Sequence, residues 1–283
     1  MAVVNKKPGT YAFRIVAYTV CILLAVLSLF PFVVMIINST RSSAQIQQHA
    51  LSLIPGSNLR INWSYLFGKG FNPIKGFEHS LLISVCTTAL TVYFSTMTAF
   101  ALVAYDWKLR KPFFTFIMAV LMIPAQVSSI GFYHMVYKIG WTNTYFPLIL
   151  PAIAAPTVVF FMRQYMIPSL PMEILQSARI DGAGEFRIFN QIVLPMMKPA
   201  MATQAIFAFV TSWNQLFMPQ VIITKMEKYT MPQMVSLLKG DTYKTEYGTV
   251  YLGLFLSVVP ILIAYFCLSK YIIEGVALGG VKG

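Results

Sequence analysis

Residues 171–199 read PMEILQSARIDGAGEFRIFNQIVLPMMKP and lie between two apolar stretches, each long enough to cross a bilayer. This segment is polar, yet its composition is compatible with helix. A membrane protein seldom needs an ordered loop of this size between two spans unless something docks on it. We therefore expect the loop to indicate what the protein does, and the flanking stretches to indicate where it works.

The composition predicts a membrane protein. Hydrophobic residues make up 57% of the chain and charged residues only 11%, and the mean hydropathy is +0.68. Soluble domains carry about 25% charged residues, because their surface faces water. Much of the surface of this chain must therefore face lipid.

Six apolar runs approach the ~20 residues that a helix needs to cross ~30 Å of hydrocarbon. Helical spans are expected because a helix satisfies its own backbone groups in lipid, and the alternation typical of a membrane β-barrel is absent. The predicted fold class is an all-α polytopic membrane protein with six transmembrane helices. They are expected at roughly 15–37, 80–104, 114–136, 144–162, 201–223 and 247–268.

The fourth run is rich in proline, and the six runs contain almost no ionisable residues. Pro147, Pro151 and Pro156 predict an irregular fourth span. Among Asp, Glu, Lys, Arg and His, only His134 falls inside a run. Ion-coupled transport needs such groups in the membrane, so their near absence argues against proton or sodium coupling.

The distribution of basic residues predicts the orientation. Twelve of the 21 Lys and Arg residues lie at the two ends, in the 105–112 turn and in the 163–200 loop; the other nine lie in 38–79, 137–143 and 224–246. This bias predicts cytoplasmic termini and a cytoplasmic 163–200 loop. Because the basic residues are scattered between spans, they suit membrane topology and anionic lipid rather than nucleic acid.

The 171–199 loop is predicted to form two short helices with a bend between them. Pro171 suits a first helical turn, and Glu173 then complements the helix dipole. Asp181-Gly182 favours a cap and a sharp turn. The expected buried faces contain Ile174, Leu175 and Ala178 in the first helix and Phe186, Phe189, Ile192, Val193 and Leu194 in the second. Such a hairpin either lies on the membrane surface or serves as a peg for a cytosolic partner.

At this point the chain resembles a family. The segment from Pro171 to Ala183, followed by Ile192-x-Leu194-Pro195, is similar to the EAA loop of bacterial ABC-importer permeases. Further similarity to the sugar-importer, maltose-type branch is found at Met122-Ile123-Pro124-x-Gln126, Leu148–Pro151, Trp213-Asn214 and the tail Glu274-Gly275…Gly280–Gly283.

The resemblance implies an ABC importer type I permease fold with a cytoplasmic two-helix coupling loop. It covers nearly the whole chain. The implied organisation is an N-terminal part at 1–76 with the first span and an extracellular loop, a transmembrane domain at 77–270 and a cytoplasmic tail at 271–283. The residues that would contact the ATPase are Glu173, Gln176, Ser177, Ala178, Asp181, Gly182 and Ala183.

One departure from the family pattern lies in this loop. Gln176-Ser177-Ala178 stands where the family usually has Glu-Ala-Ala. Glutamine keeps the shape and reach of glutamate but loses its charge, and with it a charge-assisted hydrogen bond of about twice the neutral strength. An ion pair to the ATPase at residue 176 is therefore not expected.

The chain contains no GxxxxGK[ST] sequence that would cradle a nucleotide. The resemblance therefore implies that ATP and Mg are bound by a separate cytoplasmic ABC ATPase dimer. It also implies a companion permease subunit and an extracellular solute-binding protein, which would contact the 224–246 segment unless that segment is simply a solvated loop. No cofactor, metal site or catalytic residue is expected in this chain.

Four side chains are candidates for the path of a sugar, because amide and aromatic groups suit neutral hydroxylated ligands. They are Gln126, Trp213, Asn214 and Gln215. Amide side chains also commonly bridge membrane helices, so packing is the alternative for each.

Other functions stay open at this stage. An ABC importer for another solute, such as a polyamine or an oxyanion, would use the same loop, although an anionic solute favours basic residues that the spans lack. An ion-coupled secondary carrier would transport without an ATPase. A membrane enzyme is disfavoured because no paired carboxylates, nucleophile–base set or metal spacing appears near the spans.

Overall fold

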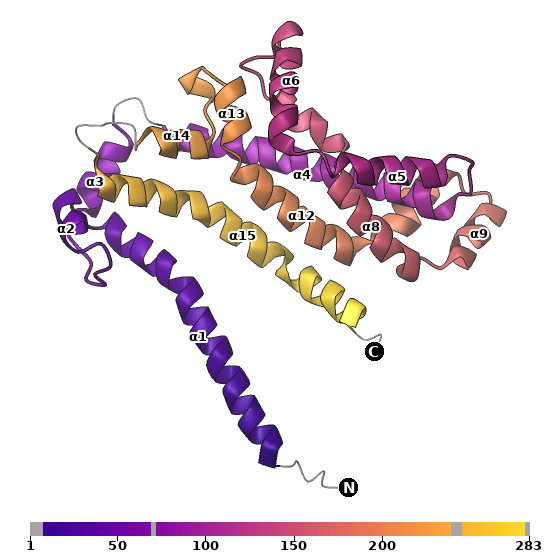
Figure 1. Cartoon of the computed structure of the whole chain (residues 1–283), viewed down its shortest axis with the longest axis horizontal. Coiled ribbons are helices and arrows are strands. Elements are labelled where there is room, and N and C mark those ends of the chain that lie inside the picture. Colours follow the sequence, from indigo (N-terminus) through magenta and orange to yellow (C-terminus); the bar gives the residue numbers. More distant parts are fainter. Residues whose placement is uncertain (1–7, 69–71, 239–244, 281–283) are drawn as a thin grey trace. The chain divides into compact units, whose positions relative to one another are not determined.

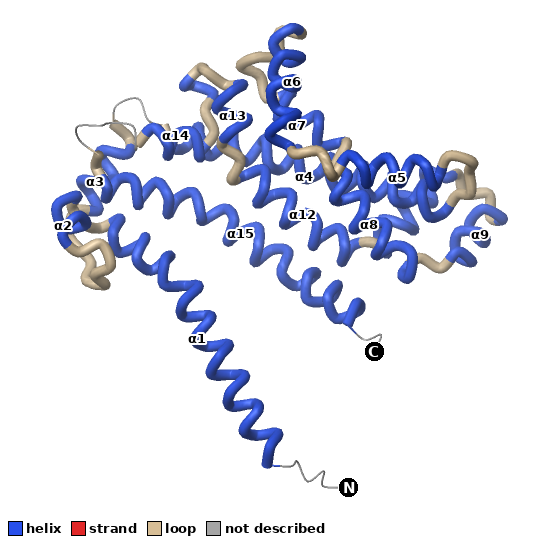
Figure 2. The backbone as a smooth tube through the Cα atoms, viewed as in Figure 1, coloured by secondary structure: helices blue, strands red, loops and turns tan. Residues whose placement is uncertain are grey.

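The computed structural model describes residues 8–68, 72–238 and 245–280 (Figure 1). Every regular element in these ranges is helical, and loops join the helices (Figure 2). The chain divides into two units, residues 1–71 with 235–256 and residues 72–234 with 257–283. The predicted all-α fold is confirmed.

The first unit is organised around a buried arginine. It contains α1 (Pro8–Ser39), α2 (Ser43–Gln48), α3 (Leu59–Leu66) and the beginning of α15 (Tyr247–Gly280). Arg41, only 5% exposed, donates to Asn38 Oδ1 over 3.0 Å and to the carbonyls of His49 and Gln45 over 2.7 and 2.9 Å. A Cβ at Gly248 would meet the Arg41 carbonyl at 2.3 Å, so α15 begins where only glycine fits.

The second unit is built on α4 (Pro73–Ala104). Helices α8 (Pro156–Ser169) and α12 (Lys198–Trp213) both pack closely along it. The buried positions of α4 include the small residues Ser84, Ser95 and Ala99, all 0% exposed. Small residues let helix backbones approach closely in a membrane, where the hydrophobic effect does not drive association.

Four helical segments are long and apolar enough to cross a membrane: Phe13–Ser39, Pro73–Ala104, Phe146–Ser169 and Tyr247–Cys267. They correspond to the first, second, fourth and sixth expected spans. The Glu185–Met196 segment and α12 form a bent pair that gives a fifth candidate. The described residues therefore do not confirm the predicted count of six continuous helices.

The third and fifth expected spans are each broken by a proline. Residues 114–136 are divided between α5 (Arg110–Val120) and α6 (Ala125–Lys138), and residues 201–223 between α12 and α13 (Phe217–Ile222). A proline ring collides with the carbonyl four residues earlier and lacks the N–H that this carbonyl needs. Pro124 acts in this way on the carbonyl of Val120, where α5 ends. Pro219 acts on the carbonyl of Gln215, which lies between α12 and α13.

The fourth span is irregular, as predicted. It consists of α7 (Phe146–Ile149), a 3₁₀ turn η1 (Leu150–Ile153) and α8. The α4 hydroxyl of Thr91 donates to the carbonyl of Ala152 in η1 over 3.2 Å. Carbonyls released by the broken helix thus find a partner inside the protein, which is the condition for irregular backbone at membrane depth.

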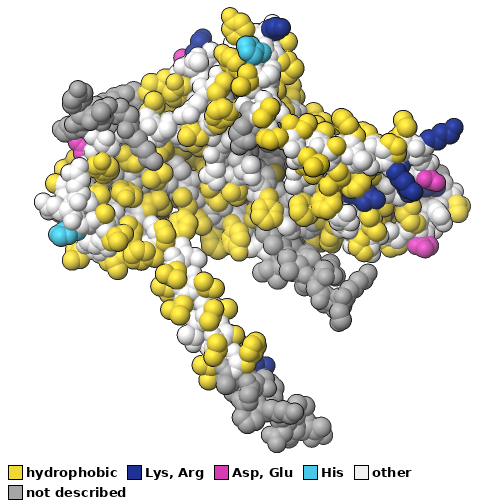
Figure 3. All heavy atoms as spheres, in the orientation of Figure 1, with side chains coloured by type: hydrophobic (Ala, Val, Ile, Leu, Met, Phe, Trp, Pro, Cys, Tyr) yellow, Lys and Arg dark blue, Asp and Glu magenta, His cyan; other side chains and the backbone are white. Residues whose placement is uncertain are grey.

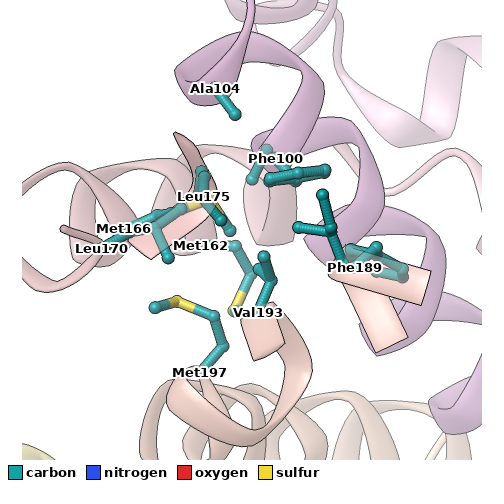
Figure 4. Close-up of a cluster of buried hydrophobic side chains, with 11 residues drawn as sticks. Phe100, Ala104, Met162, Met166, Leu170, Leu175, Phe189, Val193 and Met197 are labelled. Atoms are coloured by element: carbon teal, nitrogen blue, oxygen red, sulfur yellow. The ribbon is translucent and has the colours of Figure 1, made fainter. Parts of the chain in front are cut away.

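The 171–199 loop is an ordered part of the second unit. It contains α9 (Met172–Ile180), α10 (Glu185–Ile188), a π-helical turn η2 (Phe189–Val193) and α11 (Leu194–Met196), and its second arm turns by 81° into α12. Figure 4 shows side chains of this loop interleaved with those of α4 and α8. The buried cluster comprises Ala99, Phe100, Ala104, Met162, Met166, Leu170, Leu175, Ile188, Phe189, Val193 and Met197.

Candidate functional site

The bend in the 171–199 loop is a glycine-terminated helix end. Helix α9 ends at Ile180 with Asp181 as its C-cap, and Gly182 has φ +76°. The amide of Ala183 donates to the Ala178 carbonyl over 3.0 Å, and the amide of Gly182 donates to the Arg179 carbonyl over 3.0 Å. This pair of hydrogen bonds is the Schellman motif. The motif needs one residue in the left-handed backbone conformation, which glycine adopts without strain.

An ion pair and a tyrosine hold the two arms of the loop together. Arg179 donates from Nε to Glu185 Oε1 over 2.7 Å and from Nη2 to Oε2 over 3.3 Å. The hydroxyl of Tyr105, just beyond α4, donates to the same carboxylate. The Arg179 guanidinium, with help from Tyr105, lowers the pKa of Glu185. Burial, with the hydrogen bond to Glu185, raises the pKa of Tyr105 to about 12.

The seven predicted coupling residues are brought together on α9 and the bend. Glu173, Gln176, Ser177, Asp181 and Gly182 are exposed, and Ala178 and Ala183 are half-buried. Glu173 lies in the first turn of α9, as expected, whereas Pro171 is the residue that precedes the helix. Asp181 is a C-terminal cap, not the N-terminal cap that its residue type favours. The five exposed residues lie on the outer side of the loop, whereas Ala178 and Ala183 pack against its buried cluster.

The predicted buried faces of the loop are only partly correct. Leu175, Phe189 and Val193 are buried, but Ile174 is 43% and Phe186 71% exposed. In α9 the inward positions are taken by Leu175 and Ala178, and Ile174 is rotated away from Leu175 by the ~100° that separates helical neighbours. The fully buried Ile188 was missed, because the π-helical turn that follows it shifts the helical register.

Three apolar side chains of the loop point away from the core. Ile180 is 87% exposed, next to the bend, and Ile174 and Phe186 lie on either side of it. Exposed apolar side chains outside the core are available for contact with another protein or with lipid. We call Ile174, Ile180 and Phe186 the apolar tip of the loop.

A cavity of about 1160 Å³ lies between α4, α6, α8, α12 and α13. Its walls are mainly apolar, with the rings of Phe132, Phe161 and Phe207, and carry scattered hydroxyl groups and the amides of Gln204 and Gln215. Among the described residues, none that lines the cavity is Asp, Glu, Lys, Arg or His. The hydroxyl-bearing lining residues are Ser80, Thr87, Thr91, Ser128, Ser129, Thr157, Thr203, Thr211, Ser212 and Thr230.

The four predicted path residues separate into different roles. Gln215 lines the cavity. Trp213 is 1% exposed and donates from Nε1 to the Ser257 carbonyl over 2.9 Å, so it packs helices instead of facing the cavity. Asn214 is exposed at the end of α12, outside the cavity lining. The side chain of Gln126 lies outside the described residues.

The sequence interpretation missed Gln204 and most of the hydroxyl groups of the cavity. Gln204 is a single amide within the apolar α12, and that isolation is the signal by which it could have been found. The hydroxyl groups carry no comparable signal, since Ser and Thr occur throughout membrane helices as packing residues.

At the other end of the second unit, Asn143 organises the segment that follows α13. Its Oδ1 accepts from the amides of Thr224 and Lys225 over 2.8 and 2.9 Å, and its carbonyl accepts from Lys228 Nζ over 2.8 Å. Asn143 has φ +58°, a conformation that Asn tolerates better than most residues. The beginning of the 224–246 segment, including the short turn η3 (Met226–Lys228), is therefore fixed to this unit, while residues 239–244 lie outside the described ranges.

Comparison with known proteins gives consistent matches. Residues 91–277 match the family described as "Binding-protein-dependent transport system inner membrane component". The chain is 35% identical to the arabinooligosaccharides transport system permease protein AraQ of Halalkalibacterium halodurans, over 92% of this chain and 93% of that protein. It is 31% identical to the lactose transport system permease protein LacG of Rhizobium radiobacter, over 95% and 96% of the two chains.

A solved structure shows the same fold. A chain of a bacterial ABC transporter involved in the import of the acidic polysaccharide alginate superposes with a TM-score of 0.79 and 21% sequence identity, covering 95% of this chain and 100% of that chain.

Proposed function

Since the chain belongs to the family of binding-protein-dependent transport system inner membrane components, we propose that it is one permease subunit of an ATP-driven ABC importer. With a companion permease it forms the path of a sugar or oligosaccharide that an extracellular binding protein delivers. A cytoplasmic ABC ATPase dimer binds ATP and Mg and hydrolyses the nucleotide. Both termini and the 171–199 loop face the cytoplasm.

The observation that carries this proposal is the two-sided loop. Its inner face, through Leu175, Phe189 and Val193, is part of the core formed with α4 and α8. Its outer face presents the apolar tip, with Ile180 87% exposed. A rigid element that exposes apolar side chains beyond its own core fits a cleft in another protein, where such residues become buried anchors.

The same packing supplies a mechanical path from the loop to the cavity. Helices α4 and α8 hold the inner face of the loop, and they also contribute Thr87 and Thr157 to the cavity wall. A displacement of the loop by the closing ATPase therefore moves two walls of the cavity. Packed cores transmit such shifts because they resist continuous deformation.

The chemistry of the cavity supports a neutral, hydroxylated substrate. Hydroxyl and amide groups exchange hydrogen bonds with sugar hydroxyls, and apolar rings cover the C–H faces of the sugar. An anionic ligand needs charge-assisted hydrogen bonds from Arg or Lys, and the described lining residues include neither. The relatives AraQ and LacG are named for the transport of arabinooligosaccharides and lactose, which belong to this substrate class.

Charge placed on the apolar tip tests the docking of the ATPase. The complete transporter is co-expressed, and the ATPase that co-purifies with this chain is quantified. Ile180→Asp is expected to remove most of it, because a buried carboxylate in the interface is strongly unfavourable. Ile54→Asp, on another largely exposed isoleucine (75%) in the first unit, is expected to leave the yield unchanged. Equal yields from both variants would refute the docking site.

Transport by the chain alone separates the proposal from its main rival. Vesicles that contain only this subunit are expected to accumulate no labelled sugar under a proton or sodium gradient, whereas the complete transporter accumulates it when ATP is supplied inside. Gradient-driven accumulation by the single chain would establish a secondary carrier instead.

A further inference from the structure

An arginine without a partner lies inside one of the membrane-crossing segments. Arg163 belongs to α8, within the segment Phe146–Ser169. Its guanidinium carbon lies 4.2 Å from the centroid of the Phe114 ring on α5, and its Nε is buried without a hydrogen-bond partner. Across the described residues, Arg163 forms no ion pair with a carboxylate. A charged group in a span is costly unless an anion or water compensates it.

The helices place Arg163 near the level of the lipid headgroups. Arg163 precedes Ser169, the last residue of α8, by six residues, which is about 9 Å along the helix. Phe114 follows Arg110, the first residue of α5, by about 6 Å. The exposed Trp107 lies just before α5. Tryptophan gathers at the boundary between hydrocarbon and headgroups, so the stacked pair lies one to two helical turns inside that boundary.

The surroundings of Arg163 carry an excess of positive charge. Lys111 is exposed and precedes Phe114 by three residues, which puts both on the same face of α5. The nearby Arg110 forms an ion pair with Asp106 at 3.8 Å, whereas Lys108, Lys111 and Arg163 form none among the described residues. Figure 3 shows Lys and Arg side chains at the end of the second unit that carries α5, α8 and α9.

We propose that Arg163 and Lys111 bind the phosphate of an anionic phospholipid in the leaflet next to the coupling loop. The stack on Phe114 holds the guanidinium plane, and its two terminal amino groups match the oxygens of a phosphodiester, whereas the buried Nε does not reach them. Behind the phosphate the surface is apolar, with Phe114 packed on Leu102, Ile117 and Val159 and with Phe116 64% exposed. Of these residues the exposed Phe116 is the one that an acyl chain can contact. The proposal requires only that the chain is embedded in a membrane.

Lipid binding to the purified full-length chain tests the site. The chain is delipidated in neutral detergent and titrated with dioleoylphosphatidylglycerol or dioleoylphosphatidylcholine, and bound lipid is counted by native mass spectrometry. Arg163→Gln is expected to weaken binding of phosphatidylglycerol roughly fivefold without changing binding of phosphatidylcholine. Arg60→Gln, an exposed arginine of α3, serves as the matched control and is expected to change neither.

A second variant and a competition with phosphate complete the test. If Arg163→Gln does not fold, Lys111→Gln replaces it and is expected to weaken phosphatidylglycerol binding in the same direction. Unchanged binding in both variants would overturn the proposal. Displacement of phosphatidylglycerol by millimolar inorganic phosphate would assign the site to a free anion instead of a lipid. A variant that binds lipid normally but loses a partner subunit would assign Arg163 to a carboxylate of that partner.

Discussion

Arg179 and Glu185 meet across the bend of the 171–199 loop, with two nitrogen–oxygen distances of 2.7 and 3.3 Å. Their side chains are 34% and 45% exposed, so the pair contributes at most about 1 kcal/mol to stability. Its value lies in geometry, because a two-pronged guanidinium–carboxylate contact fixes the angle between the arms. Tyr105 donates to the same carboxylate and thereby ties the bend to the end of α4.

Replacing Arg179 with Met is expected to raise the pKa of Glu185, since the guanidinium is the main cause of its lowered value. A carboxyl group whose pKa is lowered in the folded state stabilises that state above its ordinary pKa. That contribution is lost as the pH falls through the lowered value. The wild-type loop therefore keeps its order to lower pH than the variant does. NMR titration of ¹³Cδ-labelled glutamate, with the signal assigned by Glu185→Gln, measures the shift.

The matched control for that titration is Arg187→Met. Arg187 lies on the same loop, but its Nε donates to Gln191 Oε1 over 2.9 Å and not to Glu185. It is expected to change the Glu185 titration little. An equal shift in both variants would mean that general positive charge, and not the specific pair, controls the carboxylate.

Gly182→Ala is expected to impair ATP-driven uptake while Gly184→Ala does not. A Cβ meets no atom within 4 Å at either residue, but only Gly182 has a positive φ. The left-handed conformation costs an alanine roughly 1–2 kcal/mol, which the bend can relieve by opening. Uptake rate per assembled transporter is the measurement. If both variants transport at the wild-type rate, the angle of the bend has no role in coupling.

Local signals predicted the loop well because its shape is set locally. Asp181-Gly182 marks the bend, and the prolines mark both ends and the irregular fourth span. The prolines at 124 and 219 were equally visible, yet the long apolar runs around them masked the breaks. Hydropathy measures the length of an apolar run and not the continuity of its backbone.

Side-chain roles in the cavity could not be predicted in the same way. Trp213 and Gln215 are two residues apart at the end of α12, and one is buried against Ser257 while the other lines the cavity. That difference depends on where α15 and α4 pack, which is information from distant parts of the chain. The polar character of a residue in a span indicates importance but not which neighbour it meets.

Trp213→Phe is therefore expected to affect stability, and Gln215→Leu to affect transport. The first loses the hydrogen bond to Ser257, worth about 0.6 to 2 kcal/mol in a membrane, and should lower the Tm of the solubilised protein. The second should leave Tm unchanged and reduce uptake, because it removes an amide from the cavity wall. Thermal unfolding and sugar uptake are measured for both. A Gln215→Leu protein that melts early but transports normally would exclude Gln215 from the path.

Arg41→Gln is expected to destabilise the first unit. The guanidinium is 5% exposed and satisfies Asn38 Oδ1 and two carbonyls, and each buried acceptor left unpaired costs about 1–3 kcal/mol. The shorter amide of Gln cannot reach all three. Hydrogen exchange of residues 38–50 should accelerate in the variant, and the exposed Arg60→Gln provides the control for loss of charge alone. Equal exchange in the two variants would show that the segment holds its shape without the buried guanidinium.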